Sequence, residues 1–134
     1  MTHRFVEEIV SIAEASLGGL RGRSALLVGP EEQRQPYRVL LYQAGMKYIY
    51  QEDTHYSVPA IIPQVQLLMN LPVRSTPSHP IPQLTASAIA QGCIGRRSPL
   101  LIFDLAESTS IEELAGLLPA VCLYTPDDLR LILN

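Results

Sequence analysis

Cysteine and excess positive charge are both scarce in this sequence. The two cysteines, Cys93 and Cys122, are too few for a disulfide framework, and no Cys or His pair has the spacing of a metal site, so we expect reduced thiols and no metal. Ten Lys and Arg against 13 Asp and Glu give a net charge of −3. This charge supplies no electrostatic footprint for nucleic acid or for an anionic membrane surface, so we expect no nucleic-acid partner.

Long uncharged apolar runs are missing from the start of the chain. Glu7 and Glu8 interrupt the apolar pattern of residues 1–15, which therefore lacks the run that a signal peptide or a membrane helix requires. We expect no membrane insertion and a cytoplasmic location. With 134 residues, 47% of them apolar and 17% charged, residues 1–134 are long and apolar enough for a single globular domain.

Apolar periodicity predicts helices that alternate with short buried strands. The strands are expected at residues 24–29, 46–53, 71–76, 99–104 and 121–124. The helices are expected at residues 6–17, 36–44, 65–69, 83–91, 110–118 and 127–133, with Pro36 in a first turn and a capping box at residues 110–113. This alternation indicates an α/β fold, a doubly wound parallel sheet of about five strands with helices on both faces, and residues 1–19 packed on it as an N-terminal helix.

The expected strand order is 3-2-1-4-5, which leaves the third and fifth strands at the edges. Pro72 cannot donate to a ladder and therefore favours an edge position for residues 71–76. Residues 121–124 contain no charge or proline, so we predict a homodimer or a complex with a protein partner through this edge or through the helix at 127–133. The alternative is a monomer in which a sixth strand or the last helix covers the edge.

Three stretches in order along the chain resemble glutamyl-tRNA reductase, the enzyme that reduces glutamyl-tRNA with NADPH at the start of tetrapyrrole synthesis from glutamate. They are VSIAEASLGGLRGRSALLVG at residues 10–29, RSTPSHPIPQLTASAIA at residues 74–90 and RSPLLIFDLAESTSIEELAGLLPAVCLYTPDDL at residues 97–129. The resemblance implies the Rossmann-type NAD(P)-binding domain of that family. The family's cysteine-bearing catalytic domain and its dimerising helices have no room in this chain, so the resemblance implies ancestry and fold without the reaction.

A dinucleotide site requires G-x-G-x-x-G after the first strand, because the glycines let a pyrophosphate approach backbone N–H groups at a helix N-terminus. The matching stretch is Gly29-Pro30-Glu31-Glu32-Gln33-Arg34, in which only the first glycine remains. Glu31 and Glu32 place negative charge beside the negatively charged phosphates. The repulsion between two like unit charges ~4 Å apart is roughly 4 kcal/mol at an effective dielectric of about 20. A helix terminus contributes only about 0.3–1 kcal/mol in favour. We therefore expect a degenerate site.

Other positions at the carboxyl ends of the strands complete this vestigial crevice. Glu52 and Asp53 stand where the family has an arginine suited to the 2′-phosphate of NADPH; they suit the ribose hydroxyls of NAD or are solvated turn residues. Thr76 and His79, after the third strand, are either ligand or partner contacts or solvent-exposed loop residues. The expected cofactor is none, with NAD or NADP as the alternative.

The remaining polar candidates are interpreted structurally, and no catalytic residue is assigned. Cys93 is expected to pack at a helix end and Cys122 to fill the core. Asp104 is either an acid or a cap for the backbone at residues 106–108. The arginine pairs at 21 and 23 and at 96 and 97 are expected to be solubilising surface, and His3 and His55 receive no role.

Two functions from different classes follow. The first is a stand-alone, non-catalytic module that acts through protein contacts, with a regulatory or assembly role in tetrapyrrole metabolism. The second is an NAD(P)-binding oxidoreductase domain that works with a separately encoded catalytic chain.

Overall fold

A five-stranded parallel sheet forms the centre of the molecule in the computed structural model, which describes residues 2–73, 83–107 and 109–133. Its strands are β1 (Ser24–Val28), β2 (Tyr48–Glu52), β3 (Leu67–Asn70), β4 (Leu100–Asp104) and β5 (Val121–Tyr124), in the order β2-β1-β3-β4-β5. Every neighbouring pair is parallel. The expected α/β class with a parallel, doubly wound sheet is confirmed.

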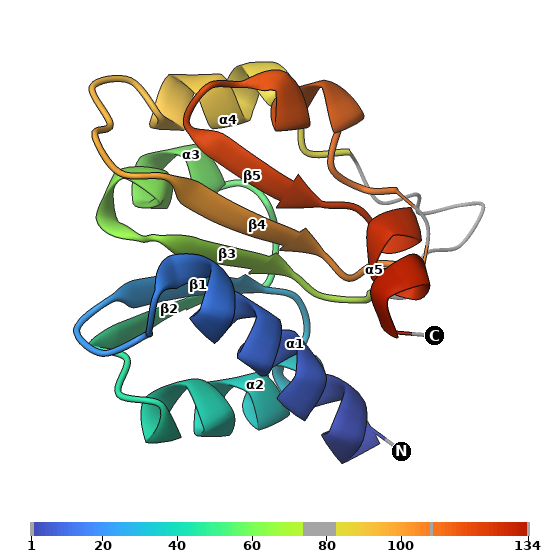
Figure 1. Cartoon of the computed structure of the whole chain (residues 1–134). Coiled ribbons are helices and arrows are strands. Elements are labelled where there is room, and N and C mark those ends of the chain that lie inside the picture. Colours follow the sequence, from blue (N-terminus) through green and yellow to red (C-terminus); the bar gives the residue numbers. More distant parts are fainter. Residues whose placement is uncertain (1, 74–82, 108, 134) are drawn as a thin grey trace.

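Helices cover both faces of this sheet (Figure 1). The elements are α1 (Thr2–Leu17), α2 (Glu31–Gln43), α3 (Val58–Ile61), the 3-10 helix η1 (Ile62–Gln64), α4 (Ala86–Gly92), the 3-10 helix η2 (Glu113–Leu117) and α5 (Pro126–Leu133). Alternate strand residues enter two separate cores, because successive side chains of a strand point to opposite faces. Ala25 and Leu27 pack with α1, α2 and α5, whereas Leu26 and Val28 pack with α3, η1, α4 and η2.

The predicted third strand and the helix before it were wrong. Residues 67–70 form β3, all four of them buried, where we expected a helix at 65–69. A short apolar run does not distinguish a buried strand from a buried helix by its periodicity alone. Pro72 lies two residues beyond the end of β3, where no ladder hydrogen bond is needed, and residues 74–76 lie outside the described part of the chain.

The strand order also differs from the prediction, since β3 is central and the edges are β2 and β5. Removing the third strand from the order 3-2-1-4-5-6 and renumbering the rest gives the observed order. The segment that follows β2 forms α3 and η1 and carries Pro59 and Pro63, which cannot donate hydrogen bonds to a ladder. The fifth strand is at an edge as predicted.

Three helix predictions required correction at their starts. α2 begins at Glu31 directly after Pro30, so Pro36 lies inside the helix, where it removes one hydrogen bond. α4 runs from Ala86 to Gly92, with the Thr85 hydroxyl accepting from the Ala88 N–H at 3.1 Å. Residues 113–117 form a 3-10 helix without a side-chain cap, because the Ser110 hydroxyl donates to Asp104 Oδ1 and does not cap this helix.

The caps of α5 and α1 tie both terminal helices to their neighbouring loops. Thr125 and Asp128 exchange hydrogen bonds at 3.0 and 3.1 Å at the start of α5. Arg23 donates to the carbonyls of Leu17 and Gly19 at the end of α1, at 2.8 and 2.9 Å, so it is a cap and not solubilising surface.

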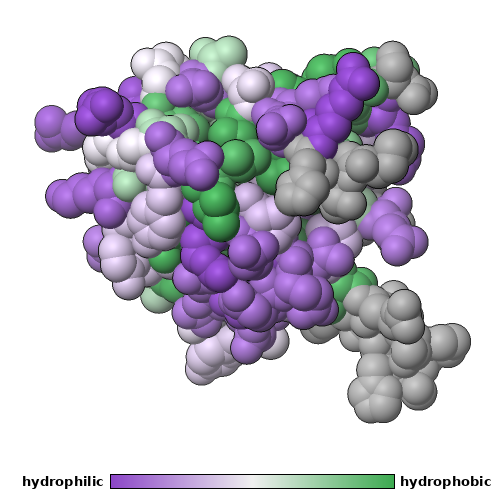
Figure 2. All heavy atoms as spheres, turned by 90° about the horizontal axis from the view of Figure 1, so that it is seen from below, coloured by the Kyte–Doolittle hydropathy of each residue, from purple (hydrophilic) through white to green (hydrophobic). Residues whose placement is uncertain are grey.

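Of the helices described, none has the length and apolarity to cross a membrane. Figure 2, seen from below Figure 1, shows hydrophilic side chains over much of this surface, with hydrophobic ones gathered near its middle.

Candidate functional site

A crevice of about 510 Å³ opens at the carboxyl ends of β1 and β3. The chain leaves β1 toward β2 on one side and later returns to form β3 on the other, so the connections diverge at this point of the sheet. Ligands of doubly wound folds bind at such a switch point. Val28, Leu71 and Val73 supply apolar walls, while the residues after β2 and at the end of β3 supply the polar groups.

Gly29 is required by the geometry of the turn after β1. Its φ is +143°, and a Cβ added to it would lie 2.9 Å from the Cβ of Leu71. The Gly29 N–H donates to the Glu52 carbonyl, and the Leu71 N–H donates to the Val28 carbonyl, each at 2.9 Å. The one glycine retained from the motif therefore lies where the ends of three strands meet.

Glu31 occupies the position of the second motif glycine, and its charge is paired. Arg38 donates to both of its carboxylate oxygens at 3.0 and 2.8 Å, and Arg34 lies 3.5 Å away. The hydrogen bond from Arg38 lowers the pKa of Glu31. The expected repulsion of a phosphate by Glu31 is therefore reduced by these two guanidinium groups, which the sequence reasoning did not place there.

Arg34 occupies the position of the third motif glycine. Its side chain is only 12% exposed and reaches Asp53 at 3.1 Å, just beyond the end of β2. The Arg34 Nε is buried and has no hydrogen-bond partner in the described part of the chain. Pro30 precedes α2 as its N-cap without a side-chain cap, and Glu52 is half-buried at the end of β2. The first turn of α2 and the end of β2, next to the crevice, are thus joined by the chain's own ion pairs.

Asp104, at the end of β4, is 1% exposed and accepts hydrogen bonds from its own loop. The N–H groups of Ser110 and Ile111 donate to one carboxylate oxygen at 2.9 and 3.0 Å, and the Ala106 N–H donates to the other at 3.3 Å. The predicted cap for the backbone after Asp104 is confirmed at Ala106. Asp104 is accordingly satisfied inside the protein and does not stand free as an acid.

Asn70 connects Asp104 to the crevice. Its side-chain NH₂ donates to Asp104 Oδ1 at 3.2 Å and also contacts the Ser110 hydroxyl. The opposite end of the amide, Oδ1, lies 2.7 Å from His55 Nε2. Because an amide oxygen only accepts, His55 must donate from Nε2, and its Nδ1 is the acceptor nitrogen when the ring is neutral. A hydrogen-bonded chain therefore runs from Asp104 through Asn70 to His55 at the crevice wall.

The comparisons with known proteins agree with this architecture. No protein-family model matches the chain. Two curated relatives are glutamyl-tRNA reductases, from Methanospirillum hungatei at 29% identity over 141 residues and from Methanoregula boonei at 30% over 142 residues. Each match covers 90% of this chain and 33% of the relative. The solved glutamyl-tRNA reductase from Methanopyrus kandleri superposes with a TM-score of 0.76 at 20% identity, over 96% of this chain and 36% of that one.

The chain is a glutamyl-tRNA-reductase-like domain. It spans about a third of the length of the curated relatives it matches. The fold is also similar to that of an NADPH-dependent glyoxylate/hydroxypyruvate reductase from Sinorhizobium meliloti, with a TM-score of 0.56 at 12% identity, over 92% of this chain and 91% of that one. This second likeness concerns the fold alone.

In this glutamyl-tRNA-reductase-like domain, only part of the predicted crevice is brought together. Gly29, Asp53 and the apolar walls line the crevice. Glu31 does not line it but pairs with Arg34, which in turn binds Asp53 at the crevice wall. Thr76 and His79 lie outside the described residues. His55 and Asn70 were missed, because they are 15 residues apart and meet only when β3 ends at Asn70. A polar residue ending an apolar run, as in Leu67–Asn70, was the signal that could have found them.

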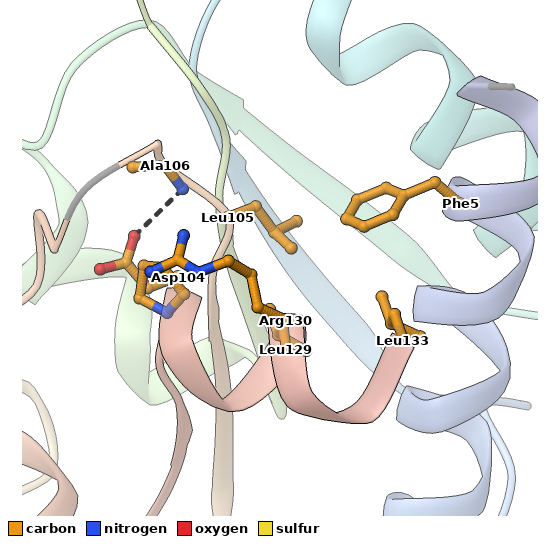
Figure 3. A pocket seen from close by; sticks show the side chains of 8 residues that line it. Phe5, Asp104, Leu105, Ala106, Leu129, Arg130 and Leu133 are labelled. Atoms are coloured by element: carbon orange, nitrogen blue, oxygen red, sulfur yellow. Dashed lines mark hydrogen bonds between the residues drawn. The ribbon is translucent and has the colours of Figure 1, made fainter.

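A second hollow of about 320 Å³ lies between α1 and α5, on the other side of the β4 end (Figure 3). Phe5, Leu105 and Leu133 point into it, and the Asp104 carboxylate faces the Ala106 N–H. Arg130 also lines this hollow but is paired with Asp127. The two charged side chains that line the hollow, Asp104 and Arg130, are therefore already paired within the protein. The hollow offers apolar contacts to a ligand but no free charged group.

The remaining predictions for single residues divide. Cys93 is half-buried at the end of α4, and burial raises the pKa of its thiol, which disfavours a thiolate nucleophile as expected. Cys122 is exposed on β5, so its interpretation as a core residue was wrong: the helices on that face do not cover it. Arg96 was also misassigned to the surface, since its half-buried guanidinium donates to the carbonyls of Ile62 at 2.9 Å and Ser98 at 2.7 Å and also contacts that of Val65. Among the described residues, no three His, Cys, Asp or Glu side chains are placed to hold a metal ion.

Proposed function

We propose that this glutamyl-tRNA-reductase-like domain acts in tetrapyrrole biosynthesis through protein contacts, as a regulatory or assembly module, and does not bind a dinucleotide. The observation that supports the proposal is the side chain of Arg34. It stands where a dinucleotide site has its third glycine, and it is held by Asp53 at 3.1 Å and Glu31 at 3.5 Å. The role in tetrapyrrole biosynthesis rests on the similarity to glutamyl-tRNA reductases.

A pyrophosphate needs free backbone N–H groups and room for close approach at the start of α2. Here Glu31 adds a side chain at the second glycine position, and both arginines are already bound to carboxylates. Two acids, Glu31 and Asp53, already pair with these two arginines beside the start of α2. A phosphate can pair with Arg34 or Arg38 only if it displaces the carboxylate that the arginine already binds. The net free energy gained from phosphate binding is therefore small.

Titration calorimetry with NADH and with NADPH tests this proposal. We expect dissociation constants weaker than about 1 mM, equivalent to about −4 kcal/mol, for both cofactors. A low-micromolar constant for either one would contradict the proposal. The purified chain is also expected to show no reduction of glutamyl-tRNA, because neither of its cysteines lines the described crevice.

Restoring the motif in steps shows which side chain blocks the site. Glu31→Gly with Gln33→Ala is expected to leave binding weak, because Arg34 remains at the third glycine position. Glu31→Gly with Arg34→Gly is expected to bind NADH more tightly than the first pair does. Glu31→Gly with Gln35→Gly is the matched control, because Gln35 is exposed on the same helix and an added glycine costs about 1 kcal/mol at either position.

For the protein contact we propose the β5 edge and a second copy of the chain. In the described sheet β5 pairs only with β4, so its other side offers unpaired backbone groups. Exposed apolar side chains lie on two helical elements that contact β5, Leu117 on η2 and Leu131 on α5. Sedimentation of the wild type against Leu123→Lys and Leu131→Glu checks this: we expect a dimer that both substitutions dissociate, and a wild-type monomer at high micromolar concentration would refute it.

The second candidate function is an NAD(P)-binding oxidoreductase domain that works with a separate catalytic chain. The position of Asp53 favours it, because an acid after the second strand can bind the ribose hydroxyls of NAD and Asp53 lines the crevice. Tight NADH binding by the wild type would select this function over the first.

A further inference from the structure

Two neighbouring hollows that share Leu133 lie between α1 and α5, and together we call them the α1–α5 groove. The first, of about 320 Å³, is the one in Figure 3, where Phe5 of α1 and Leu133 of α5 enter it from the two helices. The second, of about 440 Å³, is lined by Ile12 of α1 and Ile132 of α5 as well as by charged residues of α1. Phe5, Ile12, Ile132 and Leu133 thus give the groove an apolar floor.

The apolar floor is accessible to solvent. Phe5 is 42% exposed and Ile132 is 51% exposed, although both are large hydrophobic residues. Apolar side chains that gather on an exposed surface mark interaction sites more often than singly scattered ones do. A groove between two helices is also a shape into which a third helix packs, because its ridge of side chains fits between them. The shape of this surface therefore favours a helix as its occupant.

The negative charge of the molecule is concentrated on the same two helices. α1 and α5 carry five acids and two arginines, a net charge of −3 that equals the net charge of the whole chain. Both arginines are already paired, Arg4 with Glu8 and Arg130 with Asp127. Glu7 and Glu8 line the groove itself. Complementary charge therefore favours an occupant that carries basic residues.

We propose that the α1–α5 groove binds a basic amphipathic helix of a partner protein. The apolar stripe of this helix, with residues at i, i+3, i+4 and i+7, packs on the floor of the groove. Its lysines or arginines flank the stripe and lie beside Glu7 and Glu8. Leu131, which the proposed dimer uses, lines neither hollow. The proposal therefore extends the proposed role in protein contacts without depending on the dimer at β5.

A synthetic peptide of lysine, leucine and alanine is the probe, and fluorescence anisotropy measures its binding. It has about 14 residues, or about four helical turns, with its leucines at the i, i+3, i+4, i+7 spacing. We expect saturable binding that weakens as the salt concentration rises, because salt screens exposed charges. One control peptide has glutamate in place of every lysine, and a second has the same composition in an order without the apolar stripe. Neither control should bind over the same concentration range.

Substitutions in the groove separate its apolar contribution from its charge. Ile132→Ser removes an apolar side chain without changing the charge and should weaken the basic peptide about 5-fold. Leu114→Ser is the matched control, because Leu114 is 60% exposed on η2 and lines neither hollow. Glu7→Lys should also weaken the peptide about 5-fold. Glu113→Lys makes the same change of charge at an exposed position outside the groove and should weaken it less.

The outcomes separate this proposal from the proposed function. No saturable binding of the basic peptide, equal binding of the acidic peptide, or unchanged affinity in Ile132→Ser would each overturn the proposal. Leu123→Lys on β5 should bind the peptide as the wild type does, and loss of binding in this variant would place the contact at the β5 edge and overturn the proposal as well. A wild-type monomer or tight NADH binding would contradict the proposed function and leave peptide binding in the groove unchanged.

Discussion

The two halves of the sheet's carboxyl edge satisfy their polar groups in opposite ways. Around β1 and β2, exposed carboxylates pair with arginines, as Glu31 does with Arg38 and Asp53 does with the mostly buried Arg34. Around β3 and β4, Asn70 and Asp104 are buried and bound to backbone and side-chain donors. Exposed pairs contribute little to stability because water competes for them, whereas a buried group without its partner is costly. Substitutions in the two halves should therefore differ sharply.

The largest effect is expected from Asp104→Ala. It leaves the N–H groups of Ser110 and Ile111 and the Asn70 amide without their acceptor, so the free energy of unfolding should fall by about 4 kcal/mol. Urea unfolding followed by circular dichroism measures it. Asp104→Asn retains one accepting oxygen and should lose less. A change under 1 kcal/mol in Asp104→Ala would remove the contrast between the two halves.

Gly29→Ala should have the next largest effect. The φ of +143° and the 2.9 Å approach to Leu71 both oppose a Cβ, so we expect a loss of about 2–3 kcal/mol. Gly18→Ala is the matched control, since Gly18 also has a positive φ of +69° but has open space around it. It should lose about 1 kcal/mol. Equal losses in thermal unfolding would show that the contact with Leu71 is unimportant.

Ser110→Ala sharpens the comparison within the buried half. The hydroxyl donates to Asp104 Oδ1 at 3.2 Å, but the Ser110 backbone N–H bond to Asp104 is retained in the variant. The hydroxyl also accepts from the Asn70 amide, so the loss of these two side-chain hydrogen bonds should cost about 1–2 kcal/mol. Urea midpoints compared with those of Asp104→Ala will show whether the carboxylate or the hydroxyl carries the network; a larger loss in Ser110→Ala would reverse this ranking.

The smallest effect is expected from Glu31→Gln in the exposed half. Arg38 lowers the pKa of Glu31 in the folded chain. The ion pair therefore stabilises the fold fully at pH values above 4.5, the ordinary pKa of this glutamate, and the stabilisation is lost as the pH falls through the lower pKa of the folded state. The variant should melt slightly below the wild type at neutral pH, and the two should converge in acid. Melting curves across pH test this, with Glu8→Gln as a second exposed ion-pair variant. A difference that grows on acidification would show the sign to be wrong.

The sequence located β1, β4 and β5, because each is an apolar run bounded by turn residues, and it located β2 in the stretch after Gly45. It misplaced β3, since four buried residues carry no periodicity that separates strand from helix. The loss of the motif glycines could be read directly from residues 29–34. The pairing of Arg34 with Asp53 could not be predicted, because the two residues are 19 positions apart and meet only when β2 lies beside β1. The link from His55 to Asp104 depended on the misplaced strand and was therefore invisible.

Arg96 has a consequence for how the molecule opens locally. Its guanidinium joins the carbonyls of Ile62 and Val65 before β3 to that of Ser98 before β4. Gly92 at the end of α4 also lies against the Pro59 carbonyl, with too little space for a Cβ. Neither segment can separate from the sheet without releasing the other, so the backbone amides of Val65 and Arg96 should exchange their protons with solvent in one shared opening event. The segments that lead into β3 and β4 should therefore open as one unit, at the end of the sheet opposite the crevice.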